Sequence, residues 1–147
     1  MKNKKTAFTM IELVFIIVVL GILASVAIPK FAATRNDATI TKGKADVASI
    51  RAAIVNERQS RLIKGDSSWI TKANMDVGGL FGGVLMYGVT ISTGNDGWSA
   101  TAGSGTYVYK VAGSSNTFVY YDSTETNATK RGKFLCTSGN ECTKLAD

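Results

Sequence analysis

The sequence begins with an apolar run that is unlike the rest of the chain. From Phe8 to Ile28 it reads FTMIELVFIIVVLGILASVAI, with Glu12 as its one charged side chain. At ~1.5 Å rise per residue, a helix of this length measures roughly 31 Å, which matches the hydrocarbon thickness of a bilayer. The run therefore predicts a membrane-spanning helix.

Beyond Pro29 the apolar residues become periodic instead of continuous. Five of them fall at spacings that return to one helical face: Ile40, Val47, Ile50, Ile54 and Leu62. Two opposite-charge pairs four residues apart support the solvated face: Lys42 with Asp46, and Glu57 with Arg61. We expect the apolar face to pack on the core of a domain.

The helical pattern stops at Gly65, where a glycine after the basic Lys64 favours a left-handed cap. One helix is thus expected from about Phe8 to Lys64. The remainder is rich in Gly, Ser, Thr and Asn, with three short runs that favour strands: VLMYGVTIS, TYVYKVA and TFVYYDS. Their alternation and turn signals predict a small antiparallel meander. The fold class is therefore α+β: a long N-terminal α-helix, its first half transmembrane, packed against a small antiparallel β-sheet head.

Composition and charge narrow the possible functions. A chain of 147 residues with 45% hydrophobic content suits one modest domain and an appendage. The net charge of +6 would favour a nucleic-acid or membrane-surface partner, but Lys2, Lys4 and Lys5 supply much of it, and without them 14 basic residues stand against 11 acidic ones. The same lysines predict a cytoplasmic N-terminus.

Catalytic and metal-binding patterns are missing from the sequence. There is no histidine, which is the commonest general base, and no Gly-x-Ser-x-Gly or Cys-x-x-Cys motif. The GGLFGG stretch from Gly78 to Gly83 lacks the Lys-Ser or Lys-Thr of a phosphate-binding loop and is expected to be a plain loop. Two cysteines cannot supply a structural zinc site, so an oxidised pair outside the cytosol is the simpler account. We expect no enzyme, no cofactor and no metal.

The segment KKTAFTMIEL, from Lys4 to Leu13, resembles the processing site of type IV prepilins and of the pseudopilins of type II secretion. The resemblance lies in a short basic leader, a small residue, Phe, Thr, and a lone Glu four residues past the Phe within a membrane-length run. Pro29 also matches a proline typical of these helices. The likeness is close over the helical part and loose over the C-terminal part.

This resemblance implies that a prepilin peptidase cuts between Ala7 and Phe8 and that the new amine of Phe8 is methylated, which keeps its positive charge. The chain has Ala7 where the family usually has glycine. The implied partners are other pilin or pseudopilin subunits, the peptidase, and the inner membrane with its assembly platform. The implied location is a single-pass inner-membrane protein with a periplasmic head, then a filament of a type IV pilus, a type II secretion pseudopilus or a DNA-uptake pilus.

Four segments follow from this interpretation. Residues 1–7 are a leader that is removed, 8–29 the transmembrane and assembly helix, 30–65 an amphipathic helix that continues into the head, and 66–147 a β-rich head with a C-terminal disulfide loop. An alternative stays open, because Ser25-Val26-Ala27 has the small-x-small form of an ordinary signal peptidase site. Cleavage after Ala27 would release a soluble secreted binding protein.

Glu12 is the main candidate for an assembly residue. A carboxylate within a transmembrane run costs ~2.5 to 3.5 kcal/mol at the helix centre, so it needs a partner, and the amine of a cleaved Phe8 in the same or an adjacent subunit is the nearest candidate. Such a pair would favour one register of assembly. The alternative is a tolerated charge near the membrane interface. Gly21 and Pro29 weaken the helix between them, and by resemblance this segment unwinds in a filament, the alternative being a gentle kink.

Cys136 and Cys142 close a short ring if oxidised, which chain-entropy arguments value at roughly 2 to 2.5 kcal/mol. The ring looks like the disulfide-bounded C-terminal loop of many type IV pilins, and it is either a staple for a thin domain or a recognition loop.

Basic and acidic residues near the ring suggest two further ligands. Four cations flank it, with Tyr120 and Tyr121 nearby: Lys130, Arg131, Lys133 and Lys144. They could contact DNA through its phosphates, or they could simply be solvated. Four acidic or amide residues could be imagined as calcium ligands: Asn95, Asp96, Asp122 and Glu125. The full calcium-loop pattern of the major pseudopilins is missing, and Asn and Asp in turns bond to nearby backbone without a metal.

Overall fold

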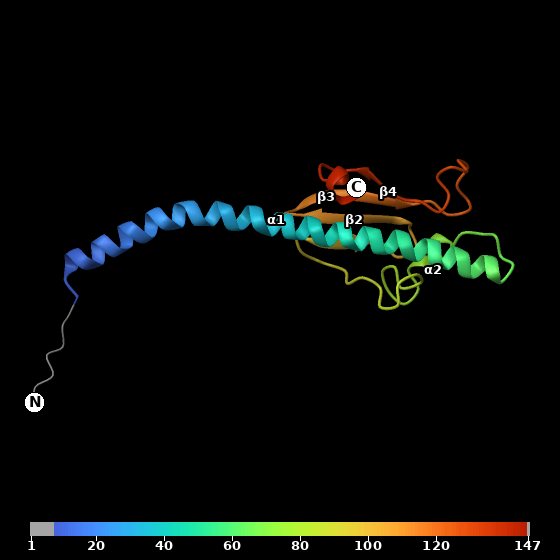
Figure 1. Cartoon of the computed structure of the whole chain (residues 1–147), viewed down its shortest axis with the longest axis horizontal. Coiled ribbons are helices and arrows are strands. Elements are labelled where there is room, and N and C mark those ends of the chain that lie inside the picture. Colours follow the sequence, from blue (N-terminus) through green and yellow to red (C-terminus); the bar gives the residue numbers. More distant parts are fainter. Residues whose placement is uncertain (1–7, 147) are drawn as a thin grey trace, which may run out of the picture. The chain divides into compact units, whose positions relative to one another are not determined.

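The computed structural model describes residues 8–146 of the chain, which divides into two units, residues 1–35 and 36–147. Helix α1 (Met10–Ile63) belongs to both units, and each unit is described by itself (Figure 1). The helix ends in a Schellman arrangement, in which the Gly65 N–H donates to the Leu62 carbonyl at 3.0 Å and the Asp66 N–H to the Arg61 carbonyl at 2.9 Å. Gly65 has a φ of 85°, so the predicted glycine stop is confirmed.

The head contains one four-stranded antiparallel sheet in the order β1-β2-β3-β4. Its strands are β1 (Gly97–Ala100), β2 (Thr106–Val111), β3 (Ser114–Tyr120) and β4 (Phe134–Ser138). Strands β2 and β3 meet at a two-residue turn in which Ala112 and Gly113 both have positive φ, 49° and 83°, as a type I′ hairpin requires. The predicted fold class, a long apolar N-terminal helix with a small antiparallel sheet, is confirmed.

Strand alternation places one face of the sheet against the second half of α1. Tyr107, Tyr109 and Val111 are buried along β2, with exposed or half-buried residues between them. From α1 the core receives Val47, Ile50 and Ile54, three of the five apolar residues that the sequence pattern selected. Ile40 is partly buried against the core, whereas Leu62 is half-exposed, so its assignment to the core was wrong.

Aromatic rings fill most of the core. Phe81 stacks on Tyr107 at 4.3 Å between ring centroids, and Phe118 stacks on Phe134 at 5.2 Å. Trp98 packs at a tilt on both Tyr109 and Phe118. Such pairs are worth about 0.5–1.5 kcal/mol beyond the area they bury. A small head with a single sheet therefore obtains a dense core from large residues.

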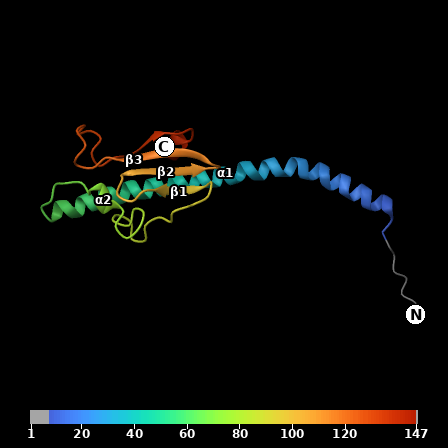
Figure 2. The same ribbon diagram turned by 180° about the vertical axis from the view of Figure 1, so that it is seen from behind.

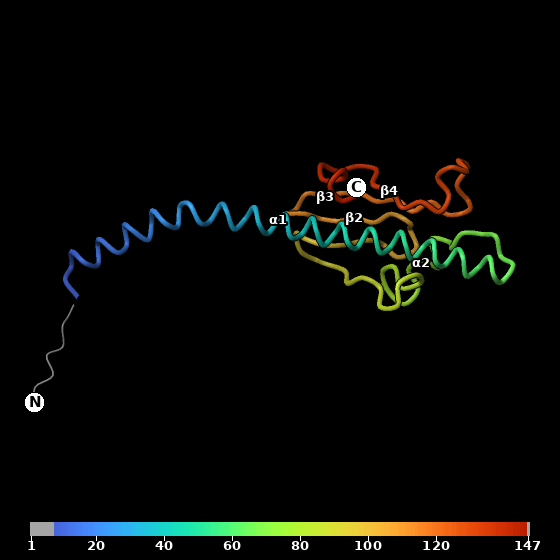
Figure 3. The backbone as a smooth tube through the Cα atoms, viewed as in Figure 1, coloured from blue at the N-terminus to red at the C-terminus, as the bar shows by residue number. Residues whose placement is uncertain are grey.

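A strand was predicted in the segment between α2 (Lys72–Met75) and β1, and this prediction was wrong (Figure 3). The run VLMYGVTIS, residues 84–92, forms no strand and makes only isolated bridges, Leu80 to Val89 and Ile91 to Trp98. Gly88 interrupts the run with a φ of 61°, a conformation that no regular strand adopts. The sheet uses β1 and β4 instead, neither of which stood out in the sequence.

The last element of the described residues is the short helix α3 (Cys142–Ala146), which packs on β4. Arg51 on α1 ties both elements down, because its Nε donates to the Phe134 carbonyl at 3.1 Å and its Nη1 to the Ala146 carbonyl at 2.7 Å. Leu145 of α3 completes the core beside Gly43. Helix α3 is therefore part of the folded head.

Candidate functional site

The first unit presents an apolar helix with almost nothing covering it. Within residues 8–35 every residue is exposed except Ala27, which is half-buried. Among the residues that the structure describes, α1 is the one helix long and apolar enough to cross a membrane, judged by length and composition. Burying a Val, Leu, Ile, Phe or Met side chain is worth about 1.5–3 kcal/mol. Contact with lipid or with other helices would stabilise a surface of this kind by removing it from water.

The N-terminus of α1 is closed by a capping box formed by Thr9 and Glu12. The Thr9 N–H and hydroxyl donate to Glu12 Oε2 at 2.9 Å and 2.8 Å, and the Glu12 N–H donates to Thr9 Oγ1 at 3.3 Å. This reciprocal pattern satisfies backbone donors that a helix start leaves without partners. Sequence reasoning treated Glu12 only as a charge, although Thr-x-x-Glu before an apolar run is the sequence signal for such a cap. Phe8 lies just before the cap and is 78% exposed, while Ala7 falls outside the described residues.

The helix continues through both positions that the sequence marked as weak. A side chain at Gly21 would find no atom within 4 Å, and Pro29 lies inside α1. Proline has no N–H, so the carbonyl of Ser25 loses its usual helical donor. The Ser25 hydroxyl donates to the Ile22 carbonyl at 2.7 Å, and a hydroxyl bonded within its own turn in this way often bends a helix.

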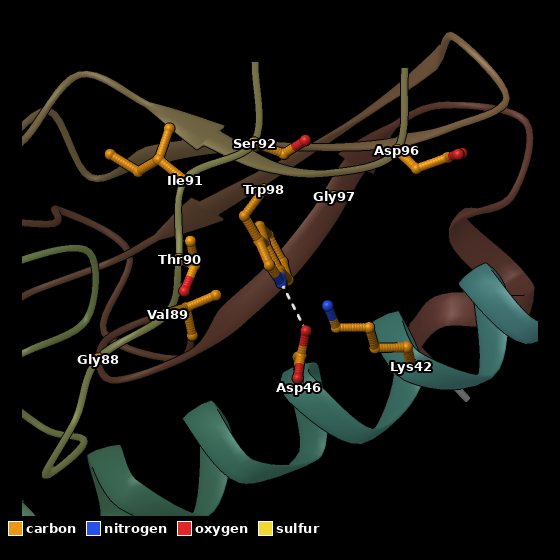
Figure 4. A pocket seen from close by; sticks show the side chains of 10 residues that line it. All are labelled: Lys42, Asp46, Gly88, Val89, Thr90, Ile91, Ser92, Asp96, Gly97 and Trp98. Carbon is orange, nitrogen blue, oxygen red and sulfur yellow. Dashed lines mark hydrogen bonds between the residues drawn. The ribbon is translucent and has the colours of Figure 1, made fainter. Parts of the chain in front are cut away.

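A cleft of about 430 Å³ opens in the head between α1 and the 88–92 segment (Figure 4). Its floor is the indole of Trp98, whose Nε1 donates to Asp46 Oδ2 at 3.0 Å. Asp46 was expected to pair with Lys42 on a solvated face, but its carboxylate accepts from the indole. The other predicted pair is present, with Arg61 Nε 2.9 Å from Glu57 Oε1. The cleft is thus lined by charged side chains on the α1 side and by an aromatic ring at its base.

Asp76 is a buried carboxylate that sequence reasoning missed. It accepts from the N–H groups of Phe81 at 3.1 Å and Gly103 at 2.8 Å, and from the Tyr107 hydroxyl at 3.1 Å. Burial, with the nearby Asp76 charge, raises the pKa of Tyr107 far above its ordinary value, so this phenol stays a donor. Three donors compensate the buried charge and fix the loop that carries Phe81. The role of Asp76 is structural.

The predicted disulfide between Cys136 and Cys142 is present, with 5.6 Å between their Cα atoms. Asn116 on β3 also holds the ring that the disulfide closes. Its side chain is fully buried, accepts from the Glu141 N–H at 2.9 Å and donates to the Tyr109 carbonyl at 3.2 Å. The ring is therefore held to the sheet by a buried amide as well as by its own bond. No sequence signal distinguished Asn116 from the turn residues around it.

Each of the four basic residues proposed as DNA contacts lies against other parts of the head. Lys130 lies over the Tyr121 ring at 5.3 Å, Arg131 Nε donates to the Glu125 carbonyl at 2.7 Å, and Lys144 Nζ is 2.7 Å from Glu141 Oε2. Lys133 lines a shallow groove beside β4. Contact with DNA through these residues stays a prediction.

Three of the four residues weighed as calcium ligands accept hydrogen bonds from backbone N–H groups through their side chains. Glu125 accepts from the Asn127 N–H at 3.1 Å, and Asp96 accepts from the Ala112 N–H at 2.7 Å. Asp122 accepts from the Thr124 N–H at 3.0 Å. Burial raises the pKa of Asp122, but hydrogen bonds from Thr124 and the N–H of residue 72 outweigh it and hold the pKa below the ordinary 3.8.

Comparison with known proteins gives one partial similarity. The chain is 34% identical over 53 residues to type II secretion system core protein G of Pseudomonas aeruginosa, a match that covers 36% of this chain and 37% of that protein. The match thus spans a little over a third of the relative's length. No family model and no solved structure matches the chain. The similarity supports the pseudopilin resemblance at the level of a pilin-like subunit.

Proposed function

We propose that this chain is a subunit of a pilin-like filament, held in the inner membrane by residues 8–29 before it assembles. The observation that carries the proposal is a helix exposed along its whole apolar length and continuous in sequence with a folded head. Lipid covers that surface before assembly, and the helices of other subunits cover it in the filament. The head stays in the periplasm, because the N-terminal lysines favour the cytoplasmic side.

Processing creates the charge that makes assembly specific. A prepilin peptidase cuts between Ala7 and Phe8, and the amine of Phe8 is methylated with its positive charge kept. Both bonds from Thr9 use Oε2 of Glu12. The other carboxylate oxygen, Oε1, is the acceptor that we assign to the Phe8 amine of the same or an adjacent subunit. A subunit in the wrong register would leave both charges without a partner in an apolar bundle.

We infer the kind of filament with support from the partial relative. Similarity to a core protein of a type II secretion system favours a pseudopilus over a type IV pilus or a DNA-uptake pilus. Partners are then other pseudopilin subunits and the assembly platform in the inner membrane. A deletion strain should lose protein secretion while keeping piliation and transformation, and the opposite pattern would move the subunit to another machine.

The processing step is tested by mass spectrometry of the mature protein. A product that begins at methylated Phe8 supports the proposal. A product that begins at Ile28 would instead establish the secretory alternative, in which signal peptidase releases a soluble protein after Ala27. Retention of the lysine-rich leader would contradict both.

Variants at the capping box separate the charge of Glu12 from its capping role. Glutamine is accepted at this position of a capping box, so Glu12→Gln keeps the cap and removes the charge, while Thr9→Ala weakens the cap and keeps the charge. We expect Glu12→Gln to reach the membrane but to be missing from sheared filaments, and Thr9→Ala to assemble. Normal filaments from Glu12→Gln would overturn the ionic role.

A further inference from the structure

The loop between α2 and β1 presents two large side chains to solvent. Met86 is 89% exposed and Tyr87 is 91% exposed, the highest exposures among the large hydrophobic side chains of the described residues. Met and Tyr are enriched at protein interfaces, and Tyr is one of the residue types enriched among their hot spots. We call these two residues the knob.

The knob is held on a rigid base. Phe81, at the start of the turn, is fully buried in the aromatic core with a φ of 58°. Val89, at its end, donates its N–H to the Leu80 carbonyl at 2.7 Å. Side chains at Gly83 or Gly88 would collide with backbone, so the turn is packed too closely for larger residues. Little conformational entropy is lost when so rigid a loop binds, which favours affinity.

A groove of about 280 Å³ lies beside β4 and is mostly apolar. We call it the β4 groove; it is lined by Arg51, Val55, Gly132, Lys133, Phe134 and Leu135. Val55 is 48% exposed, so its side chain is accessible to a ligand in the groove. Two cations flank the groove, Arg51 from α1 and Lys133 from the loop before β4. An aromatic ring placed there gains apolar contact and a cation–π interaction together.

The knob and the β4 groove lie on opposite flanks of α1. Val55 lies nine residues after Asp46, and Arg51 lies nine after Lys42, which is a rotation of roughly 180° at 3.6 residues per turn. Lys42 and Asp46 face the 88–92 segment that follows the knob, whereas Arg51 and Val55 face β4. Figures 1 and 2 show the same division, with the yellow-green segment and β4 on opposite sides of α1. One molecule cannot fill its own groove.

We propose that the knob of one copy docks into the β4 groove of the next copy, with the Tyr87 ring between Arg51 and Lys133. A protrusion and a receptor on opposite flanks make a head-to-tail contact, which propagates into an open chain and not into a closed dimer. This inference rests on the proposed filament function, since helices gathered in one bundle raise the effective concentration of neighbouring heads. The larger cleft over Trp98 is the alternative receptor, but it shares a flank with the knob, so it would favour a closed pair.

Thiol crosslinking in the assembled full-length protein tests the contact. Copies with Tyr87→Cys and copies with Val55→Cys carry different tags, are expressed together and are treated with a short bismaleimide; the native cysteines are protected as a disulfide. We expect a covalent product that contains both tags. Ile63→Cys is the matched control for Val55→Cys, because Ile63 is an apolar residue of α1, 88% exposed and outside the groove.

Four results decide between the proposal and its alternatives. Crosslinking at Ile63→Cys equal to that at Val55→Cys would overturn the proposal, and so would preferential crosslinking of Tyr87→Cys to Lys42→Cys. Cysteines placed in residues 13–20 test the helix bundle separately. If filaments form and these cysteines crosslink helix to helix, but no crosslink joins knob to groove, this contact is overturned and the proposed function stands. Loss of the helix crosslinks themselves would refute the filament.

The knob variants add a quantitative test. Truncation of a hot-spot residue lowers association about thirtyfold or more. We therefore expect Tyr87→Ala to reduce the yield of sheared filaments about thirtyfold at equal membrane levels, and Tyr87→Phe, which keeps the ring, to give a yield close to that of the wild type. Equal yields from both variants would contradict docking through the ring.

Discussion

Replacing Gly43 by alanine places a methyl group where α1 and β2 are already in contact. Gly43 is buried on the helix face that carries Val47. A Cβ atom there would lie 2.7 Å from Leu145 Cδ2 and 2.7 Å from Tyr109 Cζ, and closer still to another atom of the Tyr109 ring. Real Cβ atoms essentially never approach so closely, so the ring has to move. Its hydroxyl, which donates to the Thr39 carbonyl at 2.7 Å, moves with it.

The change in the free energy of unfolding combines two costs and one gain. Overpacking a filled core costs about 1–3 kcal/mol, and loss of the Tyr109 hydrogen bond costs about 0.5–1.5 kcal/mol. Alanine recovers about 1 kcal/mol through its higher helix propensity. The expected net loss in the free energy of unfolding is therefore about 0.5–3.5 kcal/mol. For a domain of this size each kcal/mol lowers the unfolding temperature by about 4–8 °C.

Thermal unfolding of the full-length protein in detergent micelles, followed by the near-ultraviolet circular dichroism of the aromatic residues in the head, measures this loss. Gly21→Ala is the matched control, because it makes the same chemical change in the same helix where nothing lies within 4 Å. We expect the control to leave the transition of the head unchanged. A Gly43→Ala head that unfolds at or above the wild-type temperature would refute the argument that a glycine is required for close packing.

Two further predictions concern the head. Replacing both Cys136 and Cys142 by serine should lower the free energy of unfolding by roughly 2 to 2.5 kcal/mol in urea titrations, and equal midpoints would mean that the disulfide is not a staple. Asp122 has a folded-state pKa below its ordinary value, so the stability it contributes is present above about pH 3.8 and is lost as the pH falls through the folded pKa. Asp122→Asn should therefore be less stable at neutral pH and should show a smaller loss below pH 4 than wild type. An identical acid profile would contradict this role.

Regular patterns predicted the parts of the fold that depend on local sequence. The continuous apolar run and the periodic face predicted α1, and strict alternation between residues 106 and 111 predicted β2. Strand β1 was not predicted, because it has only four residues and depends on its pairing with β2, which is a non-local property. The 84–92 run looked like a strand by composition, yet its glycine conformation and close backbone packing prevent pairing.

The candidate sites divide in the same way. Glu12 stood out because a charge is rare in a membrane-length run. The spacing of Thr9 and Glu12 is also the local pattern of the cap that they form. By contrast, Asp76 and Asn116 have ordinary surroundings in sequence and become important only through burial among distant partners. The knob resembled any apolar pair in a loop until its exposure and rigid base were known. Solvent exposure of this kind is a tertiary property that no local pattern encodes.

The two outer strands of the sheet cannot easily recruit foreign strands. Along β1, the Ser92 N–H donates to the Trp98 carbonyl at 2.7 Å, and along β4 the Arg51 guanidinium occupies the Phe134 carbonyl. Open edges are templates for amyloid-like growth, and a filament crowds heads side by side in its wall. With a carbonyl on each outer strand already bonded in this way, we expect neighbouring heads in the proposed filament to meet through side chains, and such contacts separate more readily than a shared sheet.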